Sequence, residues 1–369
     1  MGMGVMLACP KCMSAVMVHV SFVCLKDKCQ FDKDCAAGLY CFKSCNTFDQ
    51  YCAKSTFSNP FKINNSLPFN KYAFLTSHNS HATYGMSYSW KGGSSGGHED
   101  ISVTKQLNSG VRALMLSTFD REDTVWLCHD CGNKTIFSFA SGPALDLFKE
   151  VKEFLTSNPS EIITLILEDR VEAPKGLAKL FDVVGLTQYL FPLSKMPQHG
   201  RGWPSVEHMV VNNQRLVVFT SAKSKQESEG IAYQWNFMIE YKYGSEGLQI
   251  GSSTKHEGSL KVDNTSKSLV LVNYSPLSFT PCNEMNIEHL MNTLRTSYTA
   301  AGNRWANFIA IDYKKRGDGG GAFQAVDFLN GMLLCKCDDV NSCKTKCRIC
   351  SLVFYYLLYI SDVFSKTFQ

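Results

Sequence analysis

Two histidines, each following a short apolar segment, are the clearest chemical feature of this sequence. His78 follows the run 72–77, and His129 follows the run 124–128. An imidazole takes up or releases a proton near neutral pH, so two of them placed just beyond strand ends are suited to general acid–base catalysis. The pattern predicts an enzyme. Hydrogen-bonded scaffold histidines are the alternative.

Alternating strands and helices are expected to position these histidines. Nearly continuous apolar runs, typical of a parallel sheet covered on both faces, predict strands at 72–76, 112–117, 124–128, 162–168, 215–220, 268–273 and 307–312. Helical periodicity predicts helices at 143–157, 175–184, 205–212, 286–299 and 322–331. This alternation predicts an α/β fold of the TIM (β/α)8 barrel type, with a doubly wound open sheet as the alternative.

A barrel of this type carries its chemistry where strands end and loops begin. Polar residues fall at such positions throughout the chain: His78, Ser117, His129, Glu168, Lys223, Asn273 and Asp312. Lys223 is a candidate contact for a phosphate or sugar, although a solvated lysine is the simpler interpretation. Tyr274 is a candidate stacking partner for a sugar ring, although core packing is the simpler interpretation.

Composition limits the class of protein. The 369 residues are 44% hydrophobic and 19% charged, which is enough to build a large core. The net charge is +4 at pH 7, and the lysines and arginines form no cluster in the sequence, so the chain is not expected to bind nucleic acid. This charge is compatible with contact at an anionic membrane surface.

The 16 cysteines cluster toward both ends of the chain. Residues 24–56 are polar and cysteine-rich, which predicts a small N-terminal knob held by cross-links in place of a core. The cysteines expected in disulfides are Cys24, Cys29, Cys35, Cys41, Cys45, Cys52, Cys128 and Cys131. Zinc is the alternative for the pairs with ligand-like spacing, which are Cys9 with Cys12, Cys128 with Cys131, and Cys347 with Cys350.

The two ends of the chain and the glycosylation motifs favour a secreted or wall-associated protein. Residues 1–23 contain a short apolar run that resembles a signal peptide, without a clear cleavage site. Residues 344–369 include an apolar tail too short to span a bilayer, and its alternative is a packed terminal element. Four Asn-x-Ser/Thr motifs suit the secretory route: Asn64, Asn133, Asn264 and Asn273.

Several blocks of the sequence, taken in order, resemble a known family. They are residues 67–79, 110–116, 126–129, 159–169, 303–312 and 333–339. They are similar to the X-domain of phosphatidylinositol-specific phospholipase C, and more closely to the secreted plant and fungal branch of PLC-like phosphodiesterases. The resemblance covers roughly residues 24–343. It implies a distorted TIM barrel over 60–343 and phosphodiester chemistry on a phosphoinositide-like lipid or a glycerophosphodiester, by a monomer with peripheral membrane contact.

The resemblance also implies roles for single residues. His78 matches the general base, and His129 matches the general acid that protonates the leaving oxygen. Asp312 matches a carboxylate that pairs with the first histidine and fixes its tautomer.

The charge-stabilising group is less complete in this chain. Asn79 and Glu168 match calcium ligands of metal-dependent relatives, but the two acidic positions between them are Met115 and Ser117. Calcium prefers 6–8 oxygen ligands, so this set is incomplete. Arg112 is a candidate catalytic cation, although its place in a strand favours a structural ion pair. The sequence therefore predicts a phosphodiesterase of reduced activity, with a barrel that only binds a lipid head group or glycan as the alternative.

Overall fold

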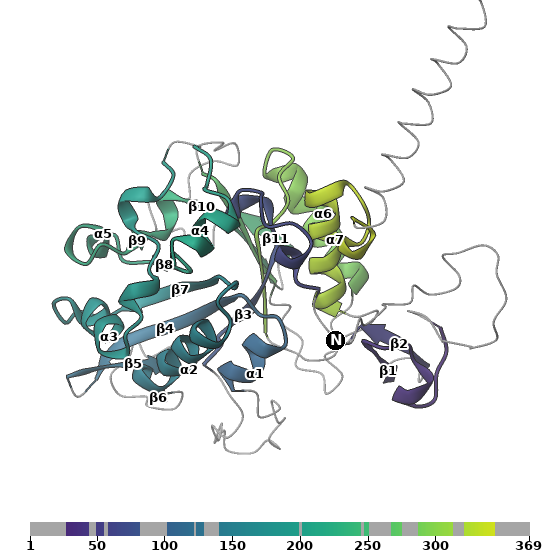
Figure 1. Cartoon of the computed structure of the whole chain (residues 1–369), viewed down its shortest axis with the longest axis horizontal. Helices are drawn as coiled ribbons and strands as arrows, with labels where there is room; N and C mark the ends of the chain where they lie inside the picture. Colours follow the sequence, from purple (N-terminus) through teal and green to yellow (C-terminus); the bar gives the residue numbers. More distant parts are fainter. Residues whose placement is uncertain are drawn as a thin grey trace, which may run out of the picture.

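The computed structural model describes residues 27–43, 49–54, 58–81, 102–121, 123–128, 140–198, 201–244, 247–250, 267–274, 287–312 and 321–343. Its centre is a curled sheet (Figure 1) whose eight parallel strands follow the order β10 (Met238–Gly244), β12 (Leu269–Tyr274), β13 (Phe308–Asp312), β3 (Phe74–His78), β4 (Ala113–Arg121), β7 (Ile163–Arg170), β8 (Leu216–Thr220) and β9 (Ala232–Tyr233). Of the described strands in this sheet, the last along the chain, β13, pairs with the first, β3. This wrap-around is a property of a barrel that a doubly wound sheet lacks, so the predicted TIM-type fold is confirmed.

The barrel is distorted by three antiparallel strands and by an open seam. Strand β11 (Gly247–Ile250) pairs with β10, β5 (Thr124–Cys128) pairs with the second half of β4, and β6 (Ala140–Pro143) pairs with β5. Within the described ranges no ladder joins β9 to β10, and a 3-10 turn at Gln234–Asn236 lies between them. The sheet is therefore a curled, incompletely closed barrel.

Helices pack on the outside of the sheet (Figure 1), and the described ones are α1 (Val103–Asn108), α2 (Ala144–Ser157), α3 (Gly176–Val184), α4 (Val206–Val211), α5 (Ser224–Ser228), α6 (Ile287–Ala300) and α7 (Gly321–Cys335). The stripe predicted for 143–157 is present in α2, where Leu147, Phe148, Val151 and Leu155 are buried. Burying such a side chain stabilises the fold by about 1.5–3 kcal/mol. None of the described helices is both long and apolar enough to cross a membrane.

Alternation along the strands separates the core into an inner and an outer layer. Leu165 and Leu167 of β7 pack in the outer layer with the helices, whereas Ile166 packs inside the barrel with Phe74 and Phe308. The inner layer continues at the amino ends of the strands into the residues Phe69, Trp203, Val206 and Met209. Apolar packing therefore fills the amino end of the barrel, and the larger polar side chains Glu168 and Asn273 face the interior further toward the carboxyl end.

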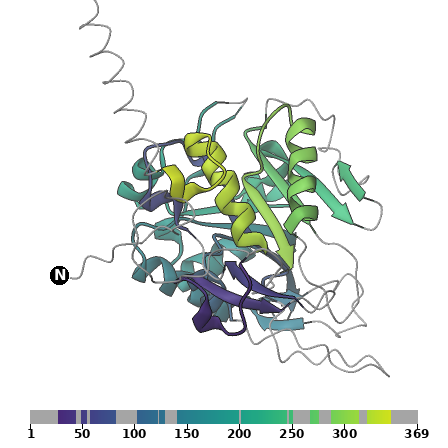
Figure 2. The same ribbon diagram turned by 90° about the vertical axis from the view of Figure 1, so that its right-hand side faces the viewer.

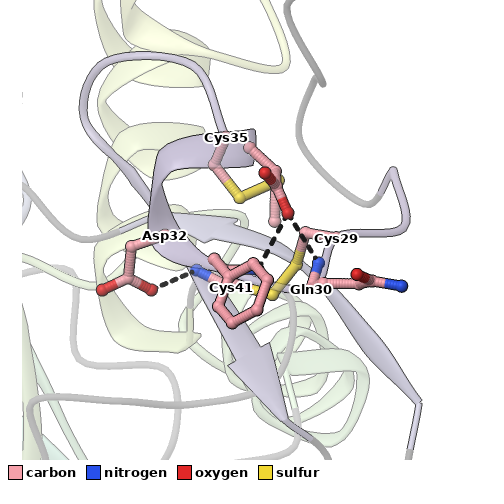
Figure 3. The surroundings of a disulfide bond; sticks show 8 residues. Cys29, Gln30, Asp32, Cys35 and Cys41 are labelled. Carbon is pink, nitrogen blue, oxygen red and sulfur yellow. Dashed lines mark hydrogen bonds between the residues drawn. A yellow bond between two sulfur atoms is a disulfide. The ribbon is translucent and has the colours of Figure 1, made fainter.

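The N-terminal knob is a two-stranded hairpin of β1 (Leu39–Lys43) and β2 (Gln50–Lys54). Two disulfides, Cys29–Cys41 and Cys35–Cys52, hold it, which confirms the prediction for these four cysteines. Figure 3 shows the Asp32 carboxylate accepting a hydrogen bond from the Cys41 backbone N–H at 2.9 Å. The hydrophobic core of the hairpin consists of Tyr40, Phe42 and Ala53, too few to fold alone, so the cross-links supply much of its stability.

The knob is anchored to the barrel through α7 (Figure 2). Lys54 at the end of β2 forms an ion pair with the fully buried Asp327 of α7. The Ser58 hydroxyl accepts a hydrogen bond from Asn341 Nδ2 at 2.9 Å. A further disulfide joins Cys335 to Cys343 at the end of α7.

Several predictions concern parts of the chain outside the described residues. These parts are the candidate signal peptide at 1–23, the apolar tail at 344–369, and the cysteines Cys9, Cys12, Cys24, Cys45, Cys131, Cys347 and Cys350. The side chain of Cys128 is also outside the description, so the predicted cross-link beside His129 stays a prediction.

Candidate active site

The carboxyl ends of the parallel strands place polar side chains on the inner face of the barrel. Ser117, Glu168 and Asn273 each come two residues after a side chain that packs against the inner layer, namely Met115, Ile166 and Leu271. Because strand side chains alternate between faces, these polar residues face the barrel interior. The polar side chains of the described residues that could contact a substrate are therefore expected at this end.

His78 ends β3 at this position. The side chain is half-buried, whereas the preceding Ser77 is fully buried. Asn79 follows with φ of 48°, a left-handed conformation that asparagine tolerates better than most residues. Its Nδ2 lies 3.4 Å from Nδ1 of His78. The chain therefore turns sharply after the strand and leaves the imidazole at the rim.

Asp312 ends the neighbouring strand, β13, and the sheet register pairs it with His78. Paired residues on adjacent strands lie on the same face, with the strands about 4.8 Å apart. The backbone thus places Asp312 where a carboxylate can orient an imidazole. Its side chain lies outside the description, so the interaction itself stays a prediction.

His129 lies outside the described residues, but the strand that leads to it is described. Residues Ala113 and Leu114 of β4 pair with β3, while Thr118–Arg121 pair with β5. Strand β5 therefore takes the place of β3 beside the second half of β4. It ends at Cys128, directly before His129.

Ser117, Glu168 and Arg170 form a continuous polar contact between β4 and β7. The Ser117 hydroxyl donates to Oε2 of Glu168 at 2.6 Å, and Nη2 of Arg170 lies 2.6 Å from Oε1 of the same carboxylate. The register pairs Ser117 with Glu168. Both oxygens of this carboxylate therefore have donors. Sequence reasoning included Glu168 but missed Arg170, whose signal was its two-residue spacing from Glu168 on a strand.

The described residues do not fit a calcium ion. Of the predicted ligands, Asn79 offers a neutral oxygen and Glu168 is paired with Arg170. Asp120 accepts hydrogen bonds from the backbone N–H groups of Glu172 and Ala173, and Asp169 accepts from the Thr220 hydroxyl at 2.7 Å. Burial raises the pKa of Asp169. These acidic groups serve local structure, and the oxygen-rich shell that calcium needs is not formed.

Arg112 has a structural role, which corrects its assignment as a catalytic candidate. It directly precedes β4, on the amino side of Ser117, which lies in the middle of that strand. Its Nε lies 2.8 Å from Oε2 of Glu161, and Nη1 donates to the carbonyl oxygens of Leu107 and Val111. Both charged side chains of the ion pair are buried. Arg112 therefore holds the amino end of the barrel together.

Of the two predicted substrate contacts, Lys223 is exposed to solvent, whereas Tyr274 is buried. Lys223 is exposed in the turn between β8 and α5, on the carboxyl side of the sheet. Tyr274 is buried in the outer layer, stacks on Tyr243 and has its hydroxyl 2.7 Å from Nδ1 of His289 on α6. The substrate contact proposed for Tyr274 is thus corrected to packing between sheet and helix.

Tyr274 should ionise far above the usual range of tyrosine. Burial, together with the neighbouring Tyr243, raises the pKa of Tyr274 from 10.0 to about 12. Because the folded-state pKa is the higher one, its contribution to stability is complete below pH 10 and is lost as the pH rises toward 12. A spectrophotometric phenolate titration should show one high-pH transition fewer in Tyr274→Phe. An unchanged titration curve would contradict this environment.

The inner face also contains polar residues that the sequence analysis did not assign. Glu240 lies on β10, a strand missing from the predicted set, and accepts a hydrogen bond from Asn273 Nδ2 at 3.1 Å. Both side chains are buried, so the glycosylation motif at Asn273 cannot carry a glycan in the folded protein. The His81 side chain, which follows β3, is also buried.

The matches with known proteins cover most of the chain. The PI-PLC X family model (PI-PLC X 1) matches residues 68–330. A PI-PLC X domain-containing protein of Arabidopsis thaliana is 39% identical over 327 residues, which are 87% of this chain and 76% of that protein. An uncharacterized secreted protein of Arthroderma benhamiae is 20% identical over 312 residues, 79% of this chain and 64% of that protein.

Among solved structures, the phosphatidylinositol-specific phospholipase C from Listeria monocytogenes aligns with a TM-score of 0.44 at 12% identity. The alignment covers 72% of this chain and 94% of that chain. The region matched by the family model runs from just before β3 into α7, so it contains the whole curled sheet.

Proposed function

Because the chain belongs to the PI-PLC X family, we propose that it is a phosphoric diester hydrolase or lyase of the phosphatidylinositol phospholipase C type. The observation that carries this proposal is the position of His78. It ends β3 in register with Asp312, on the inner face of the barrel that also carries Ser117, Glu168 and Asn273. An imidazole beside a carboxylate position at an open barrel mouth is suited to proton transfer.

The proposed reaction is an internal displacement at phosphorus. The 2-hydroxyl of an inositol-type head group attacks the phosphorus as His78 removes the hydroxyl proton, and a new O–P bond forms. The P–O bond to the leaving alcohol breaks while His129 donates a proton to its oxygen. The products are a cyclic phosphodiester and a neutral alcohol such as diacylglycerol. Asp312 would hold the His78 ring and stabilise its protonated form.

We further propose that the protein is secreted or wall-associated and consists of a small knob and a barrel. The three described disulfides support a protein that matures in an oxidising compartment and is secreted or wall-associated. The Asn64 motif remains a candidate for glycosylation because its side chain is not buried. A division into a knob at 24–56 and a barrel at 60–343 follows the hairpin and sheet. A monomer with peripheral contact to a lipid surface is part of the same proposal.

Product analysis tests the proposed function. The purified full chain is incubated with phosphatidylinositol vesicles, and separately with glycerophosphoinositol, in calcium and in EDTA. We expect cyclic inositol phosphate from at least one substrate, with similar rates in both buffers because the described residues do not form a calcium shell. If no product forms under any condition, the enzyme assignment fails. Vesicle or head-group binding without cleavage would then favour the barrel that only binds.

A further inference from the structure

We propose that the guanidinium group of Arg170 binds the substrate phosphate in this barrel, at the position where charge must be neutralised during cleavage. This inference rests on the proposed phosphodiester chemistry and assigns one of its parts. The described residues do not form a calcium shell, and Met115 and Ser117 provide no negative charge. Arg170 would supply the positive charge that a metal ion would otherwise provide.

The strand geometry places Arg170 on the correct face. Ile166 packs in the inner layer, and Glu168 and Arg170 follow it at two-residue intervals along β7, so all three share the inner face. The neighbours of Arg170 and Glu168 on β4 are Phe119 and Ser117. Arg170 therefore lies two residues further toward the carboxyl end than Glu168, and its guanidinium contacts the Glu168 carboxylate.

The ion pair with Glu168 orients the Arg170 guanidinium and leaves most of its N–H groups available to a ligand. One nitrogen, Nη2, contacts Glu168, and the Ser117 hydroxyl occupies the other oxygen of the same carboxylate. A guanidinium has five N–H donors in a planar fork that matches two phosphate oxygens. The Arg170 side chain is 41% exposed, so the remaining donors are accessible at the mouth. Glu168 thus orients the cation, and Ser117 orients Glu168.

The ion pair between Arg170 and Glu168 is expected to contribute little to the stability of the fold. Glu168 is 51% exposed and Arg170 is 41% exposed, and ion pairs this accessible to water contribute little to folding. The buried pair of Arg112 and Glu161 shows the contrast, because its side chains are only 9% and 7% exposed. A fixed, solvent-accessible cation on the catalytic face is better explained by an anionic ligand than by a structural role.

Other cations at the rim are less suitably placed. Lys242 lies on β10, three strands from β3 in the sheet order, whereas β7 is two strands away. With strands about 4.8 Å apart, this difference moves Lys242 about 5 Å further from His78 along the sheet. Arg121 stacks on Trp126 at 4.4 Å from the ring centroid. Lys223 follows β8, also three strands from β3.

The test compares Arg170→Gln and Arg170→Lys with wild type. Arg295→Gln is the matched control, because Arg295 is exposed on α6, outside the sheet. Binding of inorganic phosphate is followed by nuclear magnetic resonance titration, and kcat and KM are measured on phosphatidylinositol vesicles in EDTA. We expect Arg170→Gln to weaken phosphate binding about tenfold and to lower kcat/KM about 10- to 100-fold. Arg170→Lys should retain part of both, and thermal stability should stay unchanged.

The two readouts separate this inference from the proposed function. If phosphate binding falls in Arg170→Gln while no variant cleaves lipid, the phosphate site stands and the enzyme assignment fails. If wild type cleaves lipid and Arg170→Gln matches it in both readouts, the enzyme stands and the role of Arg170 is overturned. Equal phosphate affinity in Arg170→Gln and wild type overturns the inference in every case, and so does calcium binding that depends on Glu168.

Discussion

Replacing His78 by alanine is expected to lower kcat for phosphodiester cleavage by a factor of about 10²–10⁴, the usual contribution of a positioned general base. No other described imidazole ends a barrel strand in register with an acidic residue. The side chain is half-buried at the rim and makes no contribution to the apolar core, so the variant should fold normally. Initial rates on phosphatidylinositol vesicles, with circular dichroism as a check on folding, measure the effect.

His208→Ala is the matched control for this experiment. His208 is exposed on α4. Two other residues of this helix, Val206 and Met209, belong to the inner apolar layer at the amino end of the barrel. The control should retain wild-type kcat, because its ring is at the opposite end from the polar rim. If His78→Ala keeps full activity, His78 is a scaffold residue and the proposed base is wrong. A loss shared equally with His208→Ala would indicate a general defect in folding.

Replacing Arg112 by methionine should cost about 3–5 kcal/mol of stability, because it leaves the Glu161 carboxylate charged and buried without its partner. Glu161 is 6% exposed, and its other described donor is Asn59 Nδ2. The carbonyl oxygens of Leu107 and Val111 would each lose the hydrogen bond from Arg112, although the Gly110 backbone N–H still donates to Leu107. Urea denaturation of both proteins measures the change as a shift in midpoint at constant slope.

A second substitution shows whether the cost arises from the unpaired charge. The double variant Arg112→Met with Glu161→Leu removes both charges, and it should regain much of the lost stability. The folded fraction of Arg112→Met should retain wild-type kcat, since the pair lies at the amino end of β4 and β7. Wild-type stability combined with lost activity would return Arg112 to the catalytic site.

The elements of the barrel could be predicted closely from local sequence. The strand predicted at 162–168 is observed as Ile163–Arg170, and the helix predicted at 143–157 as Ala144–Ser157. These segments are long apolar runs or amphipathic stripes, and their period is independent of what packs against them. β10 was missed because Glu240 and Lys242 interrupt its apolar residues. They face the polar end of the barrel, where the usual hydrophobic signal is absent.

The site was predictable in position but not in orientation. Sequence placed Asn273 and Tyr274 together at one strand end, yet only Asn273 faces the barrel interior, and Tyr274 packs against α6. Successive side chains of a strand point to opposite faces of the sheet. An error of one position in the predicted strand therefore moves a residue from the site to the core or the reverse. Arg112 shows the corresponding problem along the strand, since it directly precedes β4, whereas Ser117 lies in the middle of that strand.

The linear pattern of residues was enough to predict a barrel of alternating strands and helices, a disulfide-linked knob, and His78 at a strand end. These properties depend on apolar periodicity and cysteine spacing, which are local. Which polar groups contact one another, in contrast, depends on the three-dimensional fold. The pairing of Glu168 with Arg170, of Arg112 with Glu161 and of β13 with β3 depends on strand register and on the curl of the sheet. Both arise from packing between segments far apart in the chain, which no local pattern encodes.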